Sequence, residues 1–597
     1  MRQADTHSRF VLEARLEYYL AIGSPSKVID RLEREGGVGS ELQGLFLGFA
    51  LHILYVDGLK ASREEAIAQL EFAAGALPVR QSLDARLLLI ELYLDVEHQP
   101  SDNAYDLERA TAEIQTCDKL LLEHPWPEQA ARLEAFRARI GPRTTAQLQR
   151  QFETLGGLLR LWRRTPAQAD GLGFLTNYHR RVIVSELIES LLALRGPGPG
   201  AEAAVGVLLK TQALASGARE AGVAKVTLDE VRRDLLVNGQ GMLLFFPGRF
   251  RSHLLAVGHN VVKAFTLPRF PRLVQPIDAL RNRLRESPVG WTVEDEARWA
   301  EQLTGPAREL AKQLLPDEAT ALLHDWNCVT VVDQGMLRDL PLEALVMEDG
   351  TLVGERFAIN HLGSLPFGVH LQRTRWHPPT RDALDLDLLA TLRGSPELLG
   401  DKAGPSFDFG PWRSTLDDIF GDVHVVPEDH LTVTALPEQK LTGDVHHFVM
   451  HGAHDRRRGR SPGIALVPEG PDDRGLFGTA EAAQLRAAPL VVLSVCRSAQ
   501  GVTARIGDEP ILDSLGGGVL HARNSRCHSV VQSAADLKLR PHLELMAEVF
   551  RNIHAGDPVA VALQRARAAA RQRGPDAARF RHAQVQVTGL GHRRLRQ

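Results

Sequence analysis

The sequence predicts two parts of different fold class, an α-helical repeat region followed by a three-layer α/β domain. Apolar residues recur at helical spacing up to about residue 220. Beyond that point, short β-branched and apolar runs alternate with helical segments, which is typical of a largely parallel sheet covered by helices. We place the helical region at 1–195, a linker and connecting helix at 196–224, and the α/β domain at 225–597.

The composition fits a folded protein of several domains without bulk affinity for polyanions. The chain has 597 residues, 44% of them hydrophobic, and a net charge of −4. This balance makes direct binding of nucleic acid or of anionic membrane an unfavoured interpretation. The sequence shows neither the apolar stretch of a signal peptide nor a run of about 18 apolar residues, so we expect a soluble cytoplasmic protein.

The cysteine pattern argues against metal sites and disulfides. The four cysteines are Cys117, Cys328, Cys496 and Cys527, and no two of them form a Cys-x-x-Cys pair. We therefore expect no structural zinc, no disulfide framework and no cofactor. Cysteine this sparse is typical of a reducing compartment, in which a catalytic thiol survives.

Part of the helical region has the spacing of a helical repeat. Residues 42–78 resemble a tetratricopeptide repeat, with Leu47 and Gly48 at its early positions, and a degenerate second unit follows with helices near 88–93 and 110–120. Stacked helix pairs form a concave surface, on which we expect a regulatory protein partner to dock. An irregular helical domain without a set period is the alternative.

A glycine-proline segment separates the two parts. Residues 196–200 read Gly-Pro-Gly-Pro-Gly, which predicts a hinge or exposed loop that cannot hold a helix. The α/β pattern then begins with a helix capped by Thr227, followed by a meander of strands at 242–246, 253–257 and 261–267.

A second series of strands and helices follows. Residues 340–345 read Leu-Pro-Leu-Glu-Ala-Leu, for which we expect a structural role, a tight turn and a helix begun near proline. The further elements expected are a helix at 293–315, a strand at 328–332, a strand at 386–392, a helix at 415–420, a strand at 422–427, a helix at 511–522, a strand at 529–532, helices at 541–554 and 558–571, and a strand at 584–589.

Two further apolar runs each end on a reactive side chain. The first, 445–450, is followed by His451 and Gly452, and the second, 489–495, by Cys496. Both runs are short and rich in β-branched or aromatic residues, which predicts buried strands. Residues that close buried parallel strands lie at the carboxyl edge of the sheet, where α/β proteins bind ligands. Adjacent strands would therefore bring His451 and Cys496 together.

These two runs make the chain resemble the CHAT-domain proteins, which are caspase-like cysteine peptidases of clan CD joined to tetratricopeptide repeats. Members carry one strand ending in His-Gly and another ending in a Leu-Ser-Ala-Cys type of sequence. Here these are Phe-Val-Met-His451-Gly452 and Leu-Ser-Val-Cys496. The resemblance covers an N-terminal half, 225–380, and a catalytic half, 381–597, and implies a caspase-like three-layer fold.

The resemblance implies a cysteine peptidase. Cys496 would attack the scissile carbonyl, and His451 would protonate the departing amine. The backbone amides of Gly452 and Cys496 would form the oxyanion hole, and the missing Cβ of Gly452 leaves room for substrate backbone. One position departs from the caspase signature, because Ser498 stands where caspases carry a glycine.

The resemblance also points to residues that read the substrate. Caspase-like folds bind the residue before the scissile bond with the strand and loop after the cysteine, here 529–532 and 533–536. A carboxylate at Asp536 would favour Arg or Lys in that substrate position. Asp508 and Glu509 are a second acidic candidate, and solvated loop charges are the alternative for all three.

The remaining polar residues near the motif have simpler interpretations. We interpret His446 and His447, inside the first run, as packing residues. His454 and Asp455 are placed to orient the preceding histidine, but a solvated loop is the simpler interpretation. The arginine-rich loop 456–460 is a solvated surface, a partner contact or a self-cleavage site.

We therefore expect a regulated cysteine endopeptidase that cleaves a protein substrate after a partner or signal acts on the helical repeats. By resemblance alone, a bacterial antiviral defence, conflict or regulated-proteolysis system is implied. The alternative is a catalytically silent scaffold that mediates protein–protein interaction. RNA binding by the arginine-rich loop is a third hypothesis, for which strong salt-dependent binding is the expected sign.

Overall fold

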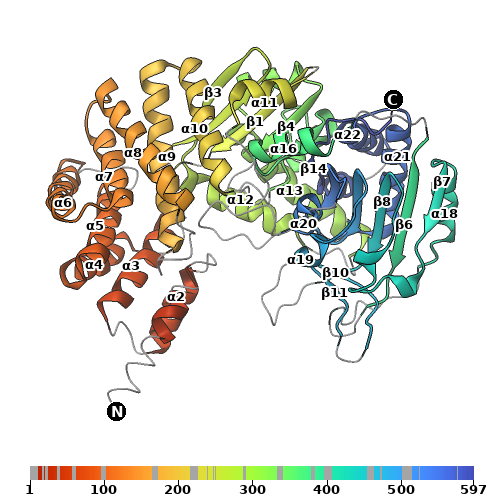
Figure 1. The fold of residues 1–597 in the computed structure, drawn as a ribbon, viewed down its shortest axis with the longest axis horizontal. Helices are drawn as coiled ribbons and strands as arrows, with labels where there is room; N and C mark the ends of the chain where they lie inside the picture. The colour runs from red at the N-terminus through yellow and green to blue at the C-terminus, as the bar shows by residue number, and fades with distance from the viewer. Residues whose placement is uncertain are drawn as a thin grey trace.

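The structure is a computed structural model in which a helical lobe and an α/β lobe lie side by side (Figure 1). The residues that it describes are 11–16, 19–20, 25–35, 40–56, 62–95, 103–164, 173–215, 226–237, 239–246, 248, 251–286, 291–332, 340–377, 383–394, 398, 407–453, 463–470, 473–499, 514–522, 525–573 and 576–596.

The first lobe is helical, as predicted. The expected repeat pair forms two packed helices, and Gly48 on the first lies so close to Leu70 on the second that an added Cβ would be 2.8 Å from the leucine Cγ. The small residue therefore allows the close approach, while the identity of the pair as a tetratricopeptide repeat stays a prediction. The helices are α2 (Pro25–Arg34), α3 (Glu41–Val56), α4 (Arg63–Ala76), α5 (Val79–Tyr93), α6 (Asn103–Glu123), α7 (Pro127–Ile140), α8 (Thr145–Arg164) and α9 (Gly173–Arg195).

The glycine-proline segment is shorter than predicted. Helix α10 (Pro199–Ala215) begins inside it, because proline is well suited to the first turn of a helix. Gly196, with a φ of +79°, follows the last residue of α9. Helix α10 is also no free linker, since Ala204 and Val205 are buried in the core that supports the sheet. The expectation that 196–200 cannot hold a helix is therefore wrong for its last two residues.

One 11-stranded sheet runs through both halves of the α/β domain, in the order β3-β2-β1-β4-β5-β14-β13-β12-β8-β6-β7. The β3-β2-β1 meander and the β13-β14 pair are antiparallel, and the other neighbours are parallel. The largely parallel sheet is thus confirmed. Its strands are β1 (Gln240–Phe246), β2 (Ser252–Val257), β3 (Val262–Leu267), β4 (Cys328–Val332), β5 (Ile359–His361), β6 (Asp385–Thr391), β7 (Asp422–Val425), β8 (Val445–Met450), β12 (Leu490–Val495), β13 (Ser529–Ser533) and β14 (Val585–Gly589).

Helices cover both faces of the sheet, which confirms the three-layer α/β architecture. In the second half, α18, α21 and α22 pack on one face and α19 and α20 on the other. Several of the helices, among them α12, α16 and α23, were not predicted. The helices are α11 (Leu228–Leu235), α12 (Phe270–Leu284), α13 (Val293–Leu314), α14 (Asp317–His324), α16 (Leu365–Thr374), α18 (Gly410–Asp417), α19 (Thr479–Ala482), α20 (Leu515–His521), α21 (Leu539–His554), α22 (Val559–Arg571) and α23 (Asp576–Ala583).

A proline lies at the start of two short elements that the sequence predicted. The helix expected at 415–420 is α18, which begins earlier because Pro411 lies in its first turn. Residues 340–345 have the expected structural role, with the short 3-10 helix η3 (Leu342–Ala344) buried directly after Pro341. The preceding turn, 333–339, lies outside the described residues.

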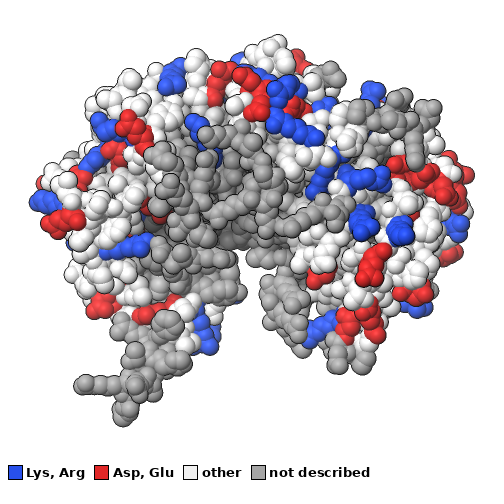
Figure 2. Space-filling model, viewed as in Figure 1, with Lys and Arg blue, Asp and Glu red and all other residues white. Residues whose placement is uncertain are grey.

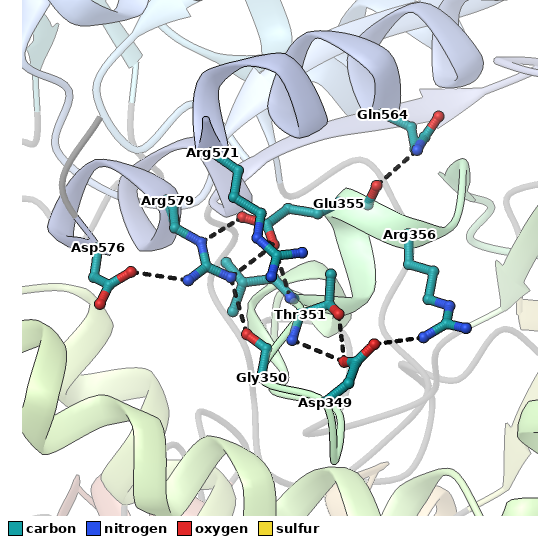
Figure 3. A network of polar contacts seen from close by, with 10 residues as sticks. Asp349, Gly350, Thr351, Glu355, Arg356, Gln564, Arg571, Asp576 and Arg579 are labelled. Carbon is teal, nitrogen blue, oxygen red and sulfur yellow. Dashed lines mark hydrogen bonds and ion pairs between the residues drawn. The ribbon is translucent and has the colours of Figure 1, made fainter. Parts of the chain in front are cut away.

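The buried residue Glu355 links the middle of the chain to the C-terminal helices α22 and α23 (Figure 3). Glu355, in the short helix α15 (Val353–Arg356), accepts two hydrogen bonds from Arg579 of α23, Nε to Oε1 at 2.6 Å and Nη2 to Oε2 at 2.8 Å. Arg579 also donates to the Gly350 carbonyl at 3.0 Å, and Gln564 of α22 donates to the Glu355 carbonyl at 2.6 Å. The α15 segment is thereby held against both helices.

The described surface carries charges of both signs. On the face drawn in Figure 2, acidic and basic side chains are interspersed, as the small net charge leads one to expect. Within the described ranges, the helices include none that is both long enough and apolar enough to cross a membrane.

Two arginines that approach the same carboxylate give a matched test of the α15 contact. The Glu355 side chain is 3% exposed, so replacing its bidentate partner in Arg579→Met should lower the free energy of unfolding by about 3 kcal/mol. Arg571 is 42% exposed and lies 4.0 Å from the same carboxylate, so Arg571→Met should cost less than about 1 kcal/mol. Denaturant unfolding of the full chain measures both, and equal losses would contradict the assignment.

Candidate active site

The two candidate catalytic residues close neighbouring strands. Strands β8 and β12 are parallel and paired over their whole length, so that Met450 lies opposite Val495. The next residues are His451 and Cys496, both partly buried. They therefore lie side by side at the carboxyl edge of the sheet, where the sequence predicted them.

The face of the sheet on which these side chains lie follows from their neighbours. Side chains alternate along a strand, so Ser494 shares a face with Cys496, and His447 shares one with His451. The Ser494 hydroxyl is 2.8 Å from the His447 Nε2 and 2.8 Å from the Nε2 of His542 on α21. Both candidate residues thus belong to the face that α21 covers.

A glycine brings the two strand ends into contact. After His451 the chain enters a small three-stranded sheet of β9 (Gly452–Ala453), β10 (Gly463–Ala465) and β11 (Leu476–Phe477). A Cβ added to Gly452 would be 2.1 Å from the carbonyl oxygen of Cys496, closer than atoms can approach. Only glycine fits this position without a shift of the cysteine backbone.

Cys496 differs from the other three cysteines in its environment. Cys117, Cys328 and Cys527 are buried, and burial raises the pKa of each thiol to about 12. Cys496 is only partly buried, and its Sγ accepts a hydrogen bond from the backbone N–H of Leu537 at 3.3 Å. A nucleophilic cysteine must be accessible to its substrate, a condition that Cys496 meets and the three buried thiols do not.

The segment after β13 is hydrogen-bonded to the residues that follow Cys496. The Arg497 N–H donates to the Ala535 carbonyl at 3.0 Å, and the Ala499 N–H donates to the Ser533 carbonyl at 2.8 Å. The loop 533–536, which was predicted to recognise the substrate, therefore lies beside the cysteine.

Asp536 is the acidic residue of this loop. Its carboxylate forms a bidentate ion pair with Arg497, in which Nε to Oδ1 and Nη2 to Oδ2 are both 2.9 Å. The Asp536 side chain is only 8% exposed, so the alternative of a solvated loop charge is wrong for this residue. Its role in reading substrate stays a prediction. Nothing in the local sequence indicated that Arg497 would be its partner.

The second acidic candidate, formed by Asp508 and Glu509, lies outside the described residues. The same holds for His454, Asp455 and the arginine-rich loop 456–460.

The two histidines inside β8 are buried, as their predicted packing role requires, but both also make polar contacts, His446 with the Asp387 carboxylate at 3.3 Å and His447 with Ser494. His446 is 1% exposed and His447 is fully buried. Burial lowers the pKa of His447 and of His542 to about 3, so both rings are neutral where they contact the Ser494 hydroxyl. Ser494, which forms a polar cluster with His447 and His542, lies two residues before the candidate nucleophile. The cluster was not predicted, because His542 comes from a helix far along the chain.

Comparison with known protein families gives a match over the α/β domain. A family model described as the CHAT domain matches residues 304–585, a segment that includes His451, Cys496 and Asp536. No curated protein matches the chain.

The contact of Gly452 with Cys496 can be tested by adding one methyl group. Gly452→Ala must displace the cysteine backbone, so the free energy of unfolding should fall by about 1–3 kcal/mol and the rate at which iodoacetamide alkylates Cys496 should change. Gly470→Ala is the control, because a Cβ there meets nothing within 4 Å. Equal stability and alkylation in the two variants would argue against the contact.

Burial of neutral histidines predicts that stability falls in mild acid. The unfolded chain binds a proton at His542 as the pH drops through about 6.5, whereas the folded chain, with a pKa of about 3, does not. Stability present at neutral pH is therefore lost between about pH 6.5 and pH 3. When the pH is lowered from about 7 to about 5, the free energy of unfolding of His542→Gln should fall by about 2 kcal/mol less than that of the unmodified chain. Denaturant unfolding at both pH values measures this, and identical pH dependence would refute it.

Proposed function

We propose that this chain, which carries a caspase-like CHAT domain, is a cysteine endopeptidase with Cys496 as nucleophile and His451 as proton donor. The observation that supports this most strongly is the register of β8 and β12, which sets the two residues next to each other. A partly exposed thiol among three buried ones adds to it, since a nucleophile must be reached by substrate.

In this proposal the reaction proceeds through an acyl-enzyme. The Cys496 sulfur attacks the scissile carbonyl, and the C–N bond breaks as His451 gives a proton to the leaving amine. A water molecule then attacks the thioester and releases the carboxylic acid and the free thiol. The backbone N–H groups of Gly452 and Cys496 would bind the oxyanion formed in each step.

The substrate in this proposal is a protein, and the helical lobe holds the regulatory partner. Two buried polar contacts join the two lobes. The Glu189 carboxylate on α9 lies 2.8 Å from the His253 ring nitrogen on β2, and the Asp95 carboxylate forms an ion pair with Arg269 at 2.7 Å. A buried charge becomes uncompensated when the opposite charge moves away. A regulatory protein that shifts the helices would therefore also disturb the sheet. A bacterial defence or regulated-proteolysis system is the setting in which we place this activity.

A peptidyl acyloxymethyl ketone, which alkylates activated thiols, tests the peptidase assignment. The full chain should be labelled at Cys496, and labelling should be lost in Cys496→Ala and fall at least about tenfold in His451→Ala. Cys527→Ala is the matched control, since this buried thiol should make no difference. Labelling that survives in Cys496→Ala, or none at all with any partner present, would favour the alternative of a catalytically silent scaffold.

A further inference from the structure

We propose that Arg497 acts as an internal substitute for a basic substrate residue, occupying the carboxylate of Asp536 until an arginine or lysine of the substrate displaces it. This inference rests on the proposed peptidase function and deepens it, because it names both the substrate class and a residue that controls access. Arg497 would then determine how strongly the site distinguishes basic from neutral residues.

The first support is the form of the ion pair. Both oxygens of Asp536 receive a hydrogen bond from the Arg497 guanidinium, each at 2.9 Å, which is the arrangement that a substrate arginine would make. The carboxylate side chain is 8% exposed and the arginine side chain 38% exposed. The arginine therefore lies on the solvent side of the carboxylate, so a competing cation must take its place.

The second support is the position of the pair beside the candidate nucleophile. Arg497 directly follows Cys496, and the residue after Asp536, Leu537, donates its N–H to the cysteine sulfur at 3.3 Å. A peptide whose carbonyl is attacked by this sulfur has the side chain before the scissile bond close by. A basic side chain there reaches the Asp536 carboxylate only if Arg497 leaves it.

The third support is the backbone of Arg497. Its φ is +58°, and among the described residues it is the one non-glycine residue with a positive φ. Residues with a Cβ adopt this left-handed conformation at a cost, so the surrounding contacts must hold it. Those contacts are the ion pair with Asp536 and the N–H bond to Ala535. Taking away the ion pair therefore leaves a strained residue that can relax away from Asp536.

Binding of benzamidine, a small planar amidinium, tests the inference without any catalytic readout. Calorimetry with the full chain should give weak binding for the unmodified protein and roughly fivefold tighter binding for Arg497→Gln, because a partly exposed ion pair no longer competes. The tighter binding should disappear in Arg497→Gln/Asp536→Asn. If Arg497→Gln binds no tighter than the unmodified chain while its thermal unfolding is unchanged, the inference is wrong.

Selectivity between two acyloxymethyl ketone probes, with arginine or leucine before the electrophile, gives the second readout. The ratio of arginine-probe to leucine-probe labelling should rise about fivefold in Arg497→Gln and less in Arg497→Lys, which keeps a charge but loses the bidentate geometry. Equal losses with both probes would instead make the pair a structural support of the cysteine. Tighter benzamidine binding without Cys496 labelling in any variant would overturn the peptidase proposal and the substrate role of Asp536. It would still support competition between Arg497 and an added cation for the Asp536 carboxylate.

Discussion

The in-register parallel pairing of β8 with β12 is the constraint on which the candidate site depends. Side chains alternate along a strand, so a slip of one residue would move His451 to the opposite face from Cys496. Buried polar contacts hold the register, since Ser494 lies within hydrogen-bonding distance of both His447 and His542. A slipped strand would leave these groups buried without partners, which costs more free energy than the bonds themselves contribute.

The site is supported by a sheet that neither half of the domain completes alone. The last strand, β14, lies between β13 of the second half and β5 of the first, where Thr588 pairs with His361. A buried cluster lies close to this junction: Glu343, fully buried, is 3.1 Å from His361 and 3.8 Å from Arg567 of α22. Loss of Arg567 would take the buried guanidinium away from the Glu343 carboxylate and leave that charge in the core with less compensation. The two halves therefore depend on each other for their stability.

The sequence was most informative where a local pattern decides the structure. The runs before His451 and Cys496 were predicted as strands because their apolar residues and boundaries are local features, and their meeting followed from general rules of parallel sheets. The bond between Arg497 and Asp536 joins residues 39 positions apart, and that between Ser494 and His542 joins residues 48 apart. No local pattern signals either contact, because each depends on how the elements pack.

At 196–200 the local pattern led to a wrong prediction. Glycine and proline together usually end a helix, but proline is also well suited to begin one, and the buried side of α10 makes a helix favourable from Pro199 onwards. Tertiary packing thus decided between two local preferences. The same reasoning applies to α18, where Pro411 starts the helix earlier than the apolar pattern indicated.

Disulfide trapping tests most directly the claim that the two strand ends form one site. In His451→Cys, the new thiol and Cys496 would close adjacent parallel strands on the same face, within the Cα separation of about 4.4–6.8 Å that a disulfide spans. Mild oxidation of the folded variant should therefore join positions 451 and 496, as peptide mass mapping would show. Thiols that stay reduced in the folded variant, or that pair with another cysteine instead, would contradict the register and the active site built on it.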